Sequence, residues 1–111
     1  MIILKINRYA IYYADLNPTV GSEISKTRPV VVVSLDAMND HLDTVVVCPL
    51  TTKLRPKWRS RLQILCGDKA ADIAVDQIRT ISKQRLENKI DQLSEEESMC
   101  LRKLITDLYG R

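Results

Sequence analysis

The sequence predicts a mainly β protein: a small, strongly curved antiparallel β-barrel that ends in one C-terminal helix. Short segments rich in Val, Ile and Tyr follow one another along most of the chain and are separated by turn residues, which is typical of a barrel built from short strands. The last stretch instead repeats apolar residues at helical spacing after a capping sequence. Because 111 residues suffice for one hydrophobic core but not for two, we expect a single domain over residues 1–111.

The first three strands are predicted from apolar, β-branched segments. Residues 9–14 form the first strand, which ends at the turn residues 15–18. A loop of about a dozen residues follows, and loops of this length are often functional or mobile. The unbroken valines of the second strand, residues 28–34, indicate burial on both faces. Residues 36–43 are expected to form a polar connection or a single helical turn, and residues 44–50 the third strand.

Residues 51–61 are the most basic part of the chain, and Trp58 lies among the charges. In an extended conformation, residues two positions apart share one face, and that face would carry Lys53, Arg55, Lys57, Arg59 and Arg61. A solvated hairpin arm accounts for this pattern. An indole beside arginines also suits single-stranded nucleic acid, because the ring stacks on bases while the cations follow the backbone.

Shorter strands complete the predicted barrel. Residues 61–65 and 72–75 are expected to pair around a turn at residues 66–68. Polar and apolar residues then alternate over residues 76–81, which predicts a strand with one face in the core and the other presenting an aspartate or an arginine.

A capping box predicts the start of the C-terminal helix. Ser94 can accept a hydrogen bond from an unpaired backbone amide, and Glu97 can reach back to the backbone of Ser94. Gly110 lies just beyond the end of the helix. An apolar stripe at helical spacing lies between these limits, and it consists of Leu101, Leu104, Ile105 and Leu108. We expect a structural helix whose stripe packs on the barrel or against a second copy of the chain.

The charge is unevenly distributed along the chain. Residues 1–61 contain nine Lys and Arg against five Asp and Glu, which gives +4, whereas residues 62–111 contain eight against nine, which gives −1. A local positive field favours a polyanionic partner, but the total of +3 is too small for a general DNA-coating protein. The longest apolar runs are far below the roughly 18 residues of a membrane span, and Met1–Leu4 lacks the basic start and length of a signal peptide. We therefore expect a cytoplasmic protein without membrane contact.

Cysteine and histidine give no sign of a metal site. Cys48, Cys66 and Cys100 have no paired spacing and are odd in number, which argues against a zinc site or a disulfide framework. We expect buried, reduced thiols. His41 lies in a polar segment and is expected to be a loop residue rather than a ligand or a base. No carboxylate cluster indicates a metal, so we predict neither a metal nor another cofactor.

Two strand ends carry the residues from which we predict a functional site. The polar loop 21–27 leads to Arg28 directly before the valine-rich second strand, so a rigid strand fixes the place of a permanent positive charge. Residues 51–53 follow the third strand in the same way. A lone arginine at such a place merely solvates a strand end. Side by side, however, the two strand ends would form one phosphate-handling site.

Three motifs occur in order: Gly21-x-Glu23 with Arg28-Pro29 before valines, Pro49-Leu50-Thr51 after valines, and Asp76-Gln77-Ile78-Arg79-Thr80-Ile81. On these motifs the sequence resembles the MazF/PemK-like toxins of bacterial toxin–antitoxin pairs, and the resemblance runs from Tyr12 to the C-terminal helix. It implies an SH3-like barrel of the CcdB/PemK kind that forms a homodimer. It also implies an endoribonuclease that cuts single-stranded RNA at short sequences without a metal and so inhibits translation and growth. The expected products carry a cyclic phosphate and a free 5′-hydroxyl.

The resemblance further implies partners and residue roles. A cognate MazE-like antitoxin would neutralise the toxin with an acidic C-terminal segment, and operator DNA would be bound only through that antitoxin. Arg28 and Thr51 match the catalytic arginine and threonine of the family, and Glu23 matches its loop acid. Residues predicted to bind RNA are Gly21, Ser22, Lys26, Thr52, Lys53, Arg55, Lys57, Trp58, Asp76, Gln77 and Arg79. Two departures lie outside this site: Tyr9-Ala10 replaces a common Gly-Asp, and Asp91 replaces a glycine.

In the implied reaction the ribose 2′-hydroxyl attacks the neighbouring phosphate, so the substrate must be RNA. Arg28 would stabilise the developing charge, because an arginine with a pKa above about 12 is a poor base. Glu23 is the nearest candidate base in the sequence, although a carboxylate that tethers the loop through a salt bridge fits equally well. Asp76 and Arg79 would order the site, contact RNA or tie a strand to the barrel through an ion pair.

Two other functions compete with this interpretation. A non-cleaving toxin of the CcdB kind acts on gyrase with the same barrel, but it has no need for the pair of Arg28 and Thr51. A catalytically silent binder of RNA or promoter DNA could act with its antitoxin as a repressor. The resemblance favours the ribonuclease, and it leaves the RNA sequence that is cut undetermined.

Overall fold

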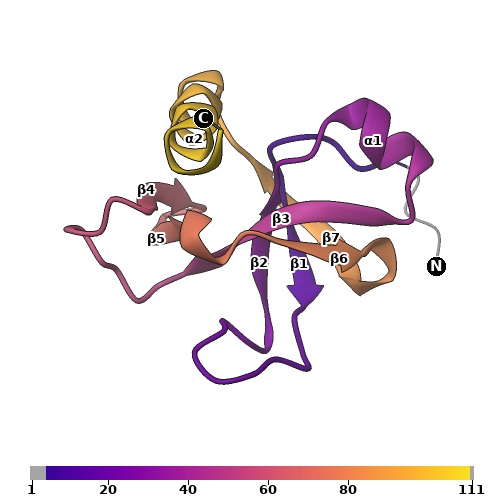
Figure 1. Ribbon diagram of the computed structural model, residues 1–111, viewed down its shortest axis with the longest axis horizontal. Coiled ribbons are helices and arrows are strands. Elements are labelled where there is room, and N and C mark those ends of the chain that lie inside the picture. The colour runs from indigo at the N-terminus through magenta and orange to yellow at the C-terminus, as the bar shows by residue number, and fades with distance from the viewer. Residues whose placement is uncertain (1–4, 111) are drawn as a thin grey trace.

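The computed structural model describes residues 5–110 of the chain. It contains a curled antiparallel sheet, with one long helix lying across part of it (Figure 1). The elements in chain order are β1 (Ala10–Asp15), β2 (Thr27–Val32), α1 (Asp36–His41), β3 (Thr44–Thr51), β4 (Arg61–Cys66), β5 (Lys69–Ala74), the 3₁₀ turn η1 (Val75–Gln77), β6 (Arg79–Ser82), the 3₁₀ turn η2 (Lys83–Arg85), β7 (Leu86–Gln92) and α2 (Glu95–Tyr109).

The sheet curls into a half-barrel in the order β4-β5-β3-β2-β1-β7, and β6 pairs with β3 outside this path. All pairs of strands are antiparallel. The prediction of a mainly β protein with a curved antiparallel sheet and a C-terminal helix is therefore confirmed. None of the helices within residues 5–110 is both long and apolar enough to cross a membrane.

Strand β2 is buried on both faces, as its valines predict. Val31 belongs to a hydrophobic cluster that it shares with β4, β5 and α2. Val30 and Val32 point the other way into a second cluster with β6 and the start of β7. Successive side chains of a strand alternate between its faces, so β2 separates the two clusters and has no solvent-facing side over these valines.

Helix α2 begins with the expected capping box. The Oγ atom of Ser94 accepts a hydrogen bond from the Glu97 amide at 3.0 Å, and the Ser94 amide donates to Oε1 of Glu97 at 2.9 Å. Leu101 is fully buried. The rest of the stripe packs against the cluster around Val31. The stripe was expected to pack on the barrel or against a second copy of the chain, and the structure shows it packed on the barrel.

The basic segment between β3 and β4 is not extended, so the condition under which its five charges would share one face is not met. Its backbone turns twice: the Trp58 amide donates to the carbonyl oxygen of Arg55 at 3.0 Å, and the Arg61 amide donates to that of Trp58 at 3.3 Å. Arg61 then begins β4, and its side chain is 8% exposed. Contacts with distant residues, described below, fix this shape.

Several local expectations are corrected. The alternating segment 76–81 divides into η1 and β6, and β7 was not predicted at all. His41 is the last residue of α1 rather than a loop residue. Of the three thiols, only Cys48 is buried, whereas Cys66 is half-buried and Cys100 is exposed. Among the described residues, no group of three or more His, Cys, Asp or Glu could hold a metal ion.

Within residues 5–110, two residues other than glycine have left-handed backbone conformations. Tyr9 has φ of 67° and Lys26 has φ of 71°, and for L-residues this region is strained. Glycine accommodates such a φ freely, whereas the tyrosine at position 9 does not. Its ring is 9% exposed and packs in the cluster around Val31. Burial of the ring therefore offsets the strain of its backbone.

Candidate functional site

The two predicted strand ends are neighbours in the sheet. The register of β2 and β3 pairs Val30 with Pro49, so Arg28 and Thr51 each lie two residues beyond this pair, at the same end of their strands. Equivalent positions on adjacent antiparallel strands lie beside each other. The two polar strand ends thus lie at the same end of adjacent strands, and both residues are half-buried.

Arg28 folds back onto the loop that precedes it. Its Nε–H donates to the carbonyl oxygen of Ser25 at 2.7 Å. Within residues 5–110, its two terminal nitrogens make no hydrogen bond or ion pair that meets normal distance criteria. Anchored by one N–H, the guanidinium keeps the two-nitrogen edge that can bind a phosphate in a bidentate manner.

Thr51 is held at the point where β3 leaves β2 and pairs with β5. It pairs with Asp72 of β5. Its Oγ1 accepts a hydrogen bond from the Lys53 amide at 3.1 Å. Because the hydroxyl accepts in this contact, its hydrogen is free to donate elsewhere. The side chain can therefore supply one donor to an anion at this strand end.

Glu23 closes a turn in the β1–β2 loop. Its Oε1 accepts a hydrogen bond from the Val20 amide at 2.6 Å, and its own amide donates to the Val20 carbonyl oxygen at 3.2 Å. The expected tether thus exists, but it binds a backbone amide rather than an arginine. Gly21, inside this turn, has φ of 60°, which suits glycine because it lacks a Cβ.

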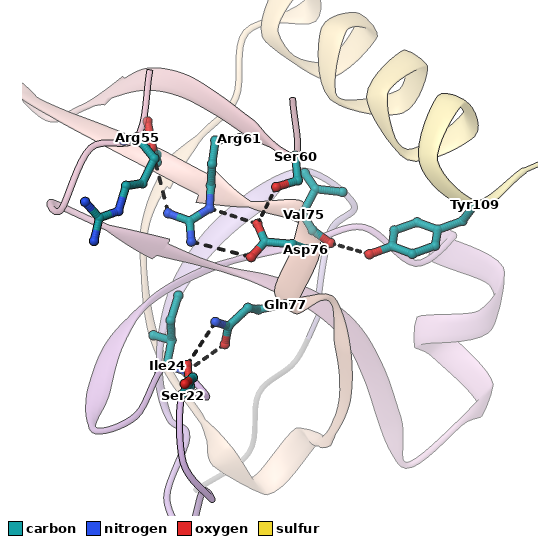
Figure 2. Close-up of polar contacts among 10 residues, drawn as sticks. Ser22, Ile24, Arg55, Ser60, Arg61, Val75, Asp76, Gln77 and Tyr109 are labelled. Carbon is teal, nitrogen blue, oxygen red and sulfur yellow. Dashed lines mark hydrogen bonds and ion pairs between the residues drawn. The ribbon is translucent and has the colours of Figure 1, made fainter. Parts of the chain in front are cut away.

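Asp76 ties the basic segment to the barrel (Figure 2). Its Oδ1 accepts hydrogen bonds from Nε of Arg61 at 2.8 Å and from Oγ of Ser60 at 3.0 Å. Partial burial opposes ionisation, but these hydrogen bonds and the charge of Arg61 lower the pKa of Asp76. The ion pair expected for Asp76 therefore exists, with Arg61 as its partner. Arg79 instead donates from Nη1 to the carbonyl oxygen of Leu16 at 3.2 Å.

The carboxylate of Asp72 also holds the basic segment between β3 and β4. Asp72 is 1% exposed, and its Oδ2 accepts a hydrogen bond from the Arg55 amide at 2.7 Å. Nη1 of Arg61 lies 3.8 Å from the same oxygen. The guanidinium of Arg61 is thus shared between Asp72 and Asp76, which compensates for its burial.

Gln77 connects the β1–β2 loop to the turn η1, to which Gln77 itself belongs (Figure 2). Its Oε1 accepts a hydrogen bond from the Ile24 amide at 2.7 Å, and its Nε2 donates to the Ser22 carbonyl oxygen at 3.2 Å. From the opposite side, the hydroxyl of Tyr109 in α2 donates to the Val75 carbonyl oxygen at 2.9 Å. The turn η1 therefore joins both loops to the C-terminal helix.

Trp58 rests on arginines in the free protein. The guanidinium carbons of Arg61 and Arg55 lie 4.6 Å and 5.3 Å from ring centroids of its indole, within the range of cation–π contacts. The residue is nevertheless 49% exposed. Other predicted RNA-binding side chains of these loops are also exposed, namely Ser22, Lys26, Thr52, Lys53 and Lys57.

Some of the predicted residues line two different pockets, and Arg28 lines neither of them. One, of about 390 Å³, is lined by the loop residues Ser22 and Glu23 and by Asp76, Gln77 and Arg79. The other, of about 400 Å³, is mainly apolar and contains Thr51 and Thr52. The second pocket also includes residues that the sequence analysis did not select, namely Tyr13, Pro29, Leu50, Cys66, Lys69 and Ile90. Tyr13 pairs with Pro29 across β1 and β2, so the register of these strands could have identified it.

Comparison with known proteins gives consistent matches. The model of the family described as PemK-like, MazF-like toxin of type II toxin–antitoxin system matches residues 7–108. The chain is 36% identical over 96 residues to Endoribonuclease EndoA from Bacillus subtilis, covering 82% of this chain and 83% of that protein.

Solved structures of similar proteins share the fold. A MazF from Deinococcus radiodurans matches with a TM-score of 0.83 and 18% identity, covering 98% of this chain and 100% of its own. An endoribonuclease from a mycobacterial species, solved in complex with its cognate antitoxin, matches with a TM-score of 0.79 and 22% identity, covering 95% of both chains.

Proposed function

The chain belongs to the PemK-like, MazF-like toxins of type II toxin–antitoxin systems, and from this premise we propose that it is an endoribonuclease that cuts single-stranded RNA at short sequences. The observation that carries the proposal is the position of Arg28 and Thr51 at the same end of the adjacent strands β2 and β3, with the terminal nitrogens of Arg28 available. The name of the 36% identical relative from Bacillus subtilis supports it.

The proposed reaction is attack of the ribose 2′-hydroxyl on the adjacent phosphate, without a metal. Negative charge then develops on the non-bridging oxygens and on the leaving 5′-oxygen. Arg28 offers two terminal N–H groups to this charge, and Thr51 offers its hydroxyl. Preorganised donors of this kind lower a barrier by about 3 kcal/mol each. As the 2′-oxygen bonds to phosphorus, the bond from phosphorus to the 5′-oxygen breaks; the 2′-hydroxyl gives its proton to water, and the 5′-oxygen takes a proton from water. The products are a 2′,3′-cyclic phosphate and a free 5′-hydroxyl.

The surrounding residues would bind the RNA and hold the site. We assign Glu23 to closing the loop, since its Oε1 already binds the Val20 amide. Exposed cations between β3 and β4 would follow the phosphate backbone. Trp58 would stack a base on the side of its ring that is open to solvent.

We further propose a homodimer and an acidic protein partner. The mainly apolar pocket beside Thr51, with Tyr13 and Ile90 in its wall, is the kind of surface that a second copy can cover. The structurally similar mycobacterial endoribonuclease is bound to a cognate antitoxin. An antitoxin with an acidic segment would suit the basic residues 53–59 here, in competition with RNA. Both RNA and antitoxin would meet the protein in the cytoplasm.

The test is incubation of the purified protein with a long single-stranded RNA, or with DNA of the same sequence, in EDTA. We expect discrete cuts in the RNA with 5′-hydroxyl ends, intact DNA, and no cuts by the Arg28→Ala variant. Arg102→Ala is the matched control, because Arg102 is an exposed arginine on α2, away from the two strand ends. RNA of varied sequence that stays intact would overturn the proposal in favour of a non-cleaving toxin or a repressor.

A further inference from the structure

Gln77 lies at the centre of the contacts that join the β1–β2 loop to the rest of the protein. We propose that Gln77 is a positioning residue, whose amide holds the loop backbone so that the Ser25 carbonyl oxygen orients Arg28. The kinetic part of this inference rests on the proposed ribonuclease activity, whereas its structural part does not. It differs from the role in RNA binding that the sequence suggested for Gln77.

The first step is the fit between the amide and the loop. Oε1 accepts from the Ile24 amide at 2.7 Å while Nε2 donates to the Ser22 carbonyl oxygen at 3.2 Å. The donor and the acceptor of one side chain thus match an acceptor and a donor of one short backbone segment. This pairing fixes the orientation of the amide, because a flipped amide would place like groups together in both contacts. The residues joined are 53 and 55 positions apart in the chain.

The second step is that Gln77 is itself firmly placed. The neighbouring Val75 receives the Tyr109 hydroxyl on its carbonyl oxygen at 2.9 Å, and its amide donates to the Ser60 carbonyl oxygen at 3.0 Å. Asp76 is bound by Arg61. Because α2 and β4 both hold η1, the turn is the fixed side of the contact and the loop is the side that is positioned.

The third step leads from the loop to Arg28. Ile24 donates its amide to Gln77, and the next residue, Ser25, receives the Nε–H of Arg28 at 2.7 Å. Only one peptide unit separates these two contacts. A shift of the Ile24 amide therefore moves the carbonyl group that orients the guanidinium. Reaction rates are sensitive to such shifts, since a misplacement of about 1 Å can cost about 100-fold.

Hydrogen exchange of the free protein tests the structural part. We expect the Ile24 amide to exchange up to about tenfold faster in Gln77→Ala, as for the loss of one hydrogen bond. Gln77→Glu retains an acceptor for Ile24 but puts a carboxylate oxygen in place of the donor to Ser22, so its Ile24 amide should stay closer to wild type. Gln63→Ala is the matched control, because Gln63 is an exposed glutamine on β4. If the Ile24 amide exchanges at the same rate in Gln77→Ala as in wild type, Gln77 does not hold the loop backbone, and the structural part of the proposal is overturned.

Cleavage kinetics test the consequence for Arg28. At saturating RNA we expect the kcat of Gln77→Ala to fall by about 10- to 100-fold, with a KM within about twofold of wild type. The kcat of Gln77→Glu should lie between those of wild type and Gln77→Ala. A rise in KM at constant kcat would instead make Gln77 an RNA contact and overturn the positioning role. If the wild type cuts no RNA, the proposed function fails. The exchange rate of the Ile24 amide still tests whether Gln77 holds the loop backbone. If Gln77→Ala does not fold, Gln77→Met replaces it in both measurements with the same expected outcomes, because methionine has a similar length but neither the amide donor nor the amide acceptor.

Discussion

The Nε–H of Arg28 donates to the carbonyl oxygen of Ser25 at 2.7 Å. The residue proposed to stabilise charge on the phosphate is thus oriented by its own loop, three residues earlier in the chain. This contact uses the Nε–H, which a bidentate phosphate contact through the two terminal nitrogens does not need. The loop can therefore orient Arg28 without competing with the substrate.

We predict that Arg28→Lys retains RNA binding but loses cleavage. Lysine keeps the positive charge, yet its ammonium group has neither the planar fork nor the Nε–H that binds Ser25. Cleavage should fall by about 100-fold, comparable to the loss of one preorganised donor. Single-turnover rates at saturating RNA measure this effect, with Arg102→Lys as the control. A lysine variant that cuts at the wild-type rate would show that Arg28 does not act through its fork.

The ion pair of Asp76 and Arg61 predicts a pH-dependent stability difference. The pKa of Asp76 is lowered from 3.8 in the folded state, so its contribution is present above pH 3.8 and is lost as the pH falls through the folded pKa. At neutral pH, Asp76→Asn should reduce the free energy of unfolding by about 1 kcal/mol, a modest value because solvent screens this exposed carboxylate.

Urea denaturation of wild type and Asp76→Asn from pH 7 to pH 3 measures this difference. The difference in the free energy of unfolding between the two proteins should shrink as the pH falls below 3.8. Asp107→Asn provides the control, because its partner Lys103 is on the exposed face of α2. A stability difference that stays constant down to pH 3 would contradict the ion pair as its source.

Lys26 predicts a stabilising substitution. Its φ of 71° is strained for any side chain, and Lys26 is exposed, so little packing is lost when the side chain is removed. Lys26→Gly should raise the free energy of unfolding by about 1 kcal/mol. Tyr9→Gly, at φ of 67°, should instead destabilise the protein, because it removes a buried ring. Thermal melting compares both variants, and a destabilised Lys26→Gly would refute the strain at this position.

The thiols are predicted to react in order of their exposure. Burial, reinforced by the charge of Asp76, raises the pKa of Cys48 to about 12, and burial also raises the pKa of Cys66. Thiolates react and thiols do not, so iodoacetamide at pH 8 should modify the exposed Cys100 first, Cys66 slowly and Cys48 only after unfolding. Mass spectrometry of peptides over time measures the order. Early labelling of Cys48 would place it outside the core.

The sequence predicts those parts of the fold that local patterns determine. The valines of β2 indicate two-sided burial, and the Ser94–Glu97 box marks the start of α2. Strand β7 was missed because Leu86–Gln92 contains only two aliphatic residues, which do not alternate strictly with its polar ones. Pairing with β1 along the sheet, which no local pattern reveals, makes it a strand.

The candidate site could be predicted only in part for the same reason. Motif order and strand ends were enough to select Arg28 and Thr51, which lie at the same end of two adjacent strands. The regular spacing of charges left open whether residues 51–61 are extended, and contacts with Asp72 and Asp76 hold them in turns. Such contacts join residues 15 to 17 positions apart, so they depend on the tertiary fold and leave no periodic signal.

The most direct test of the proposed mechanism uses an RNA oligonucleotide that contains one mapped cut. A single 2′-deoxy nucleotide is placed on the 5′ side of that cut, and in the control at a position two nucleotides away. We predict that wild-type protein in EDTA cuts the control but leaves the first oligonucleotide intact, because the attacking hydroxyl is missing. Cleavage of the first oligonucleotide at the same phosphate would contradict attack by the 2′-hydroxyl and require another nucleophile.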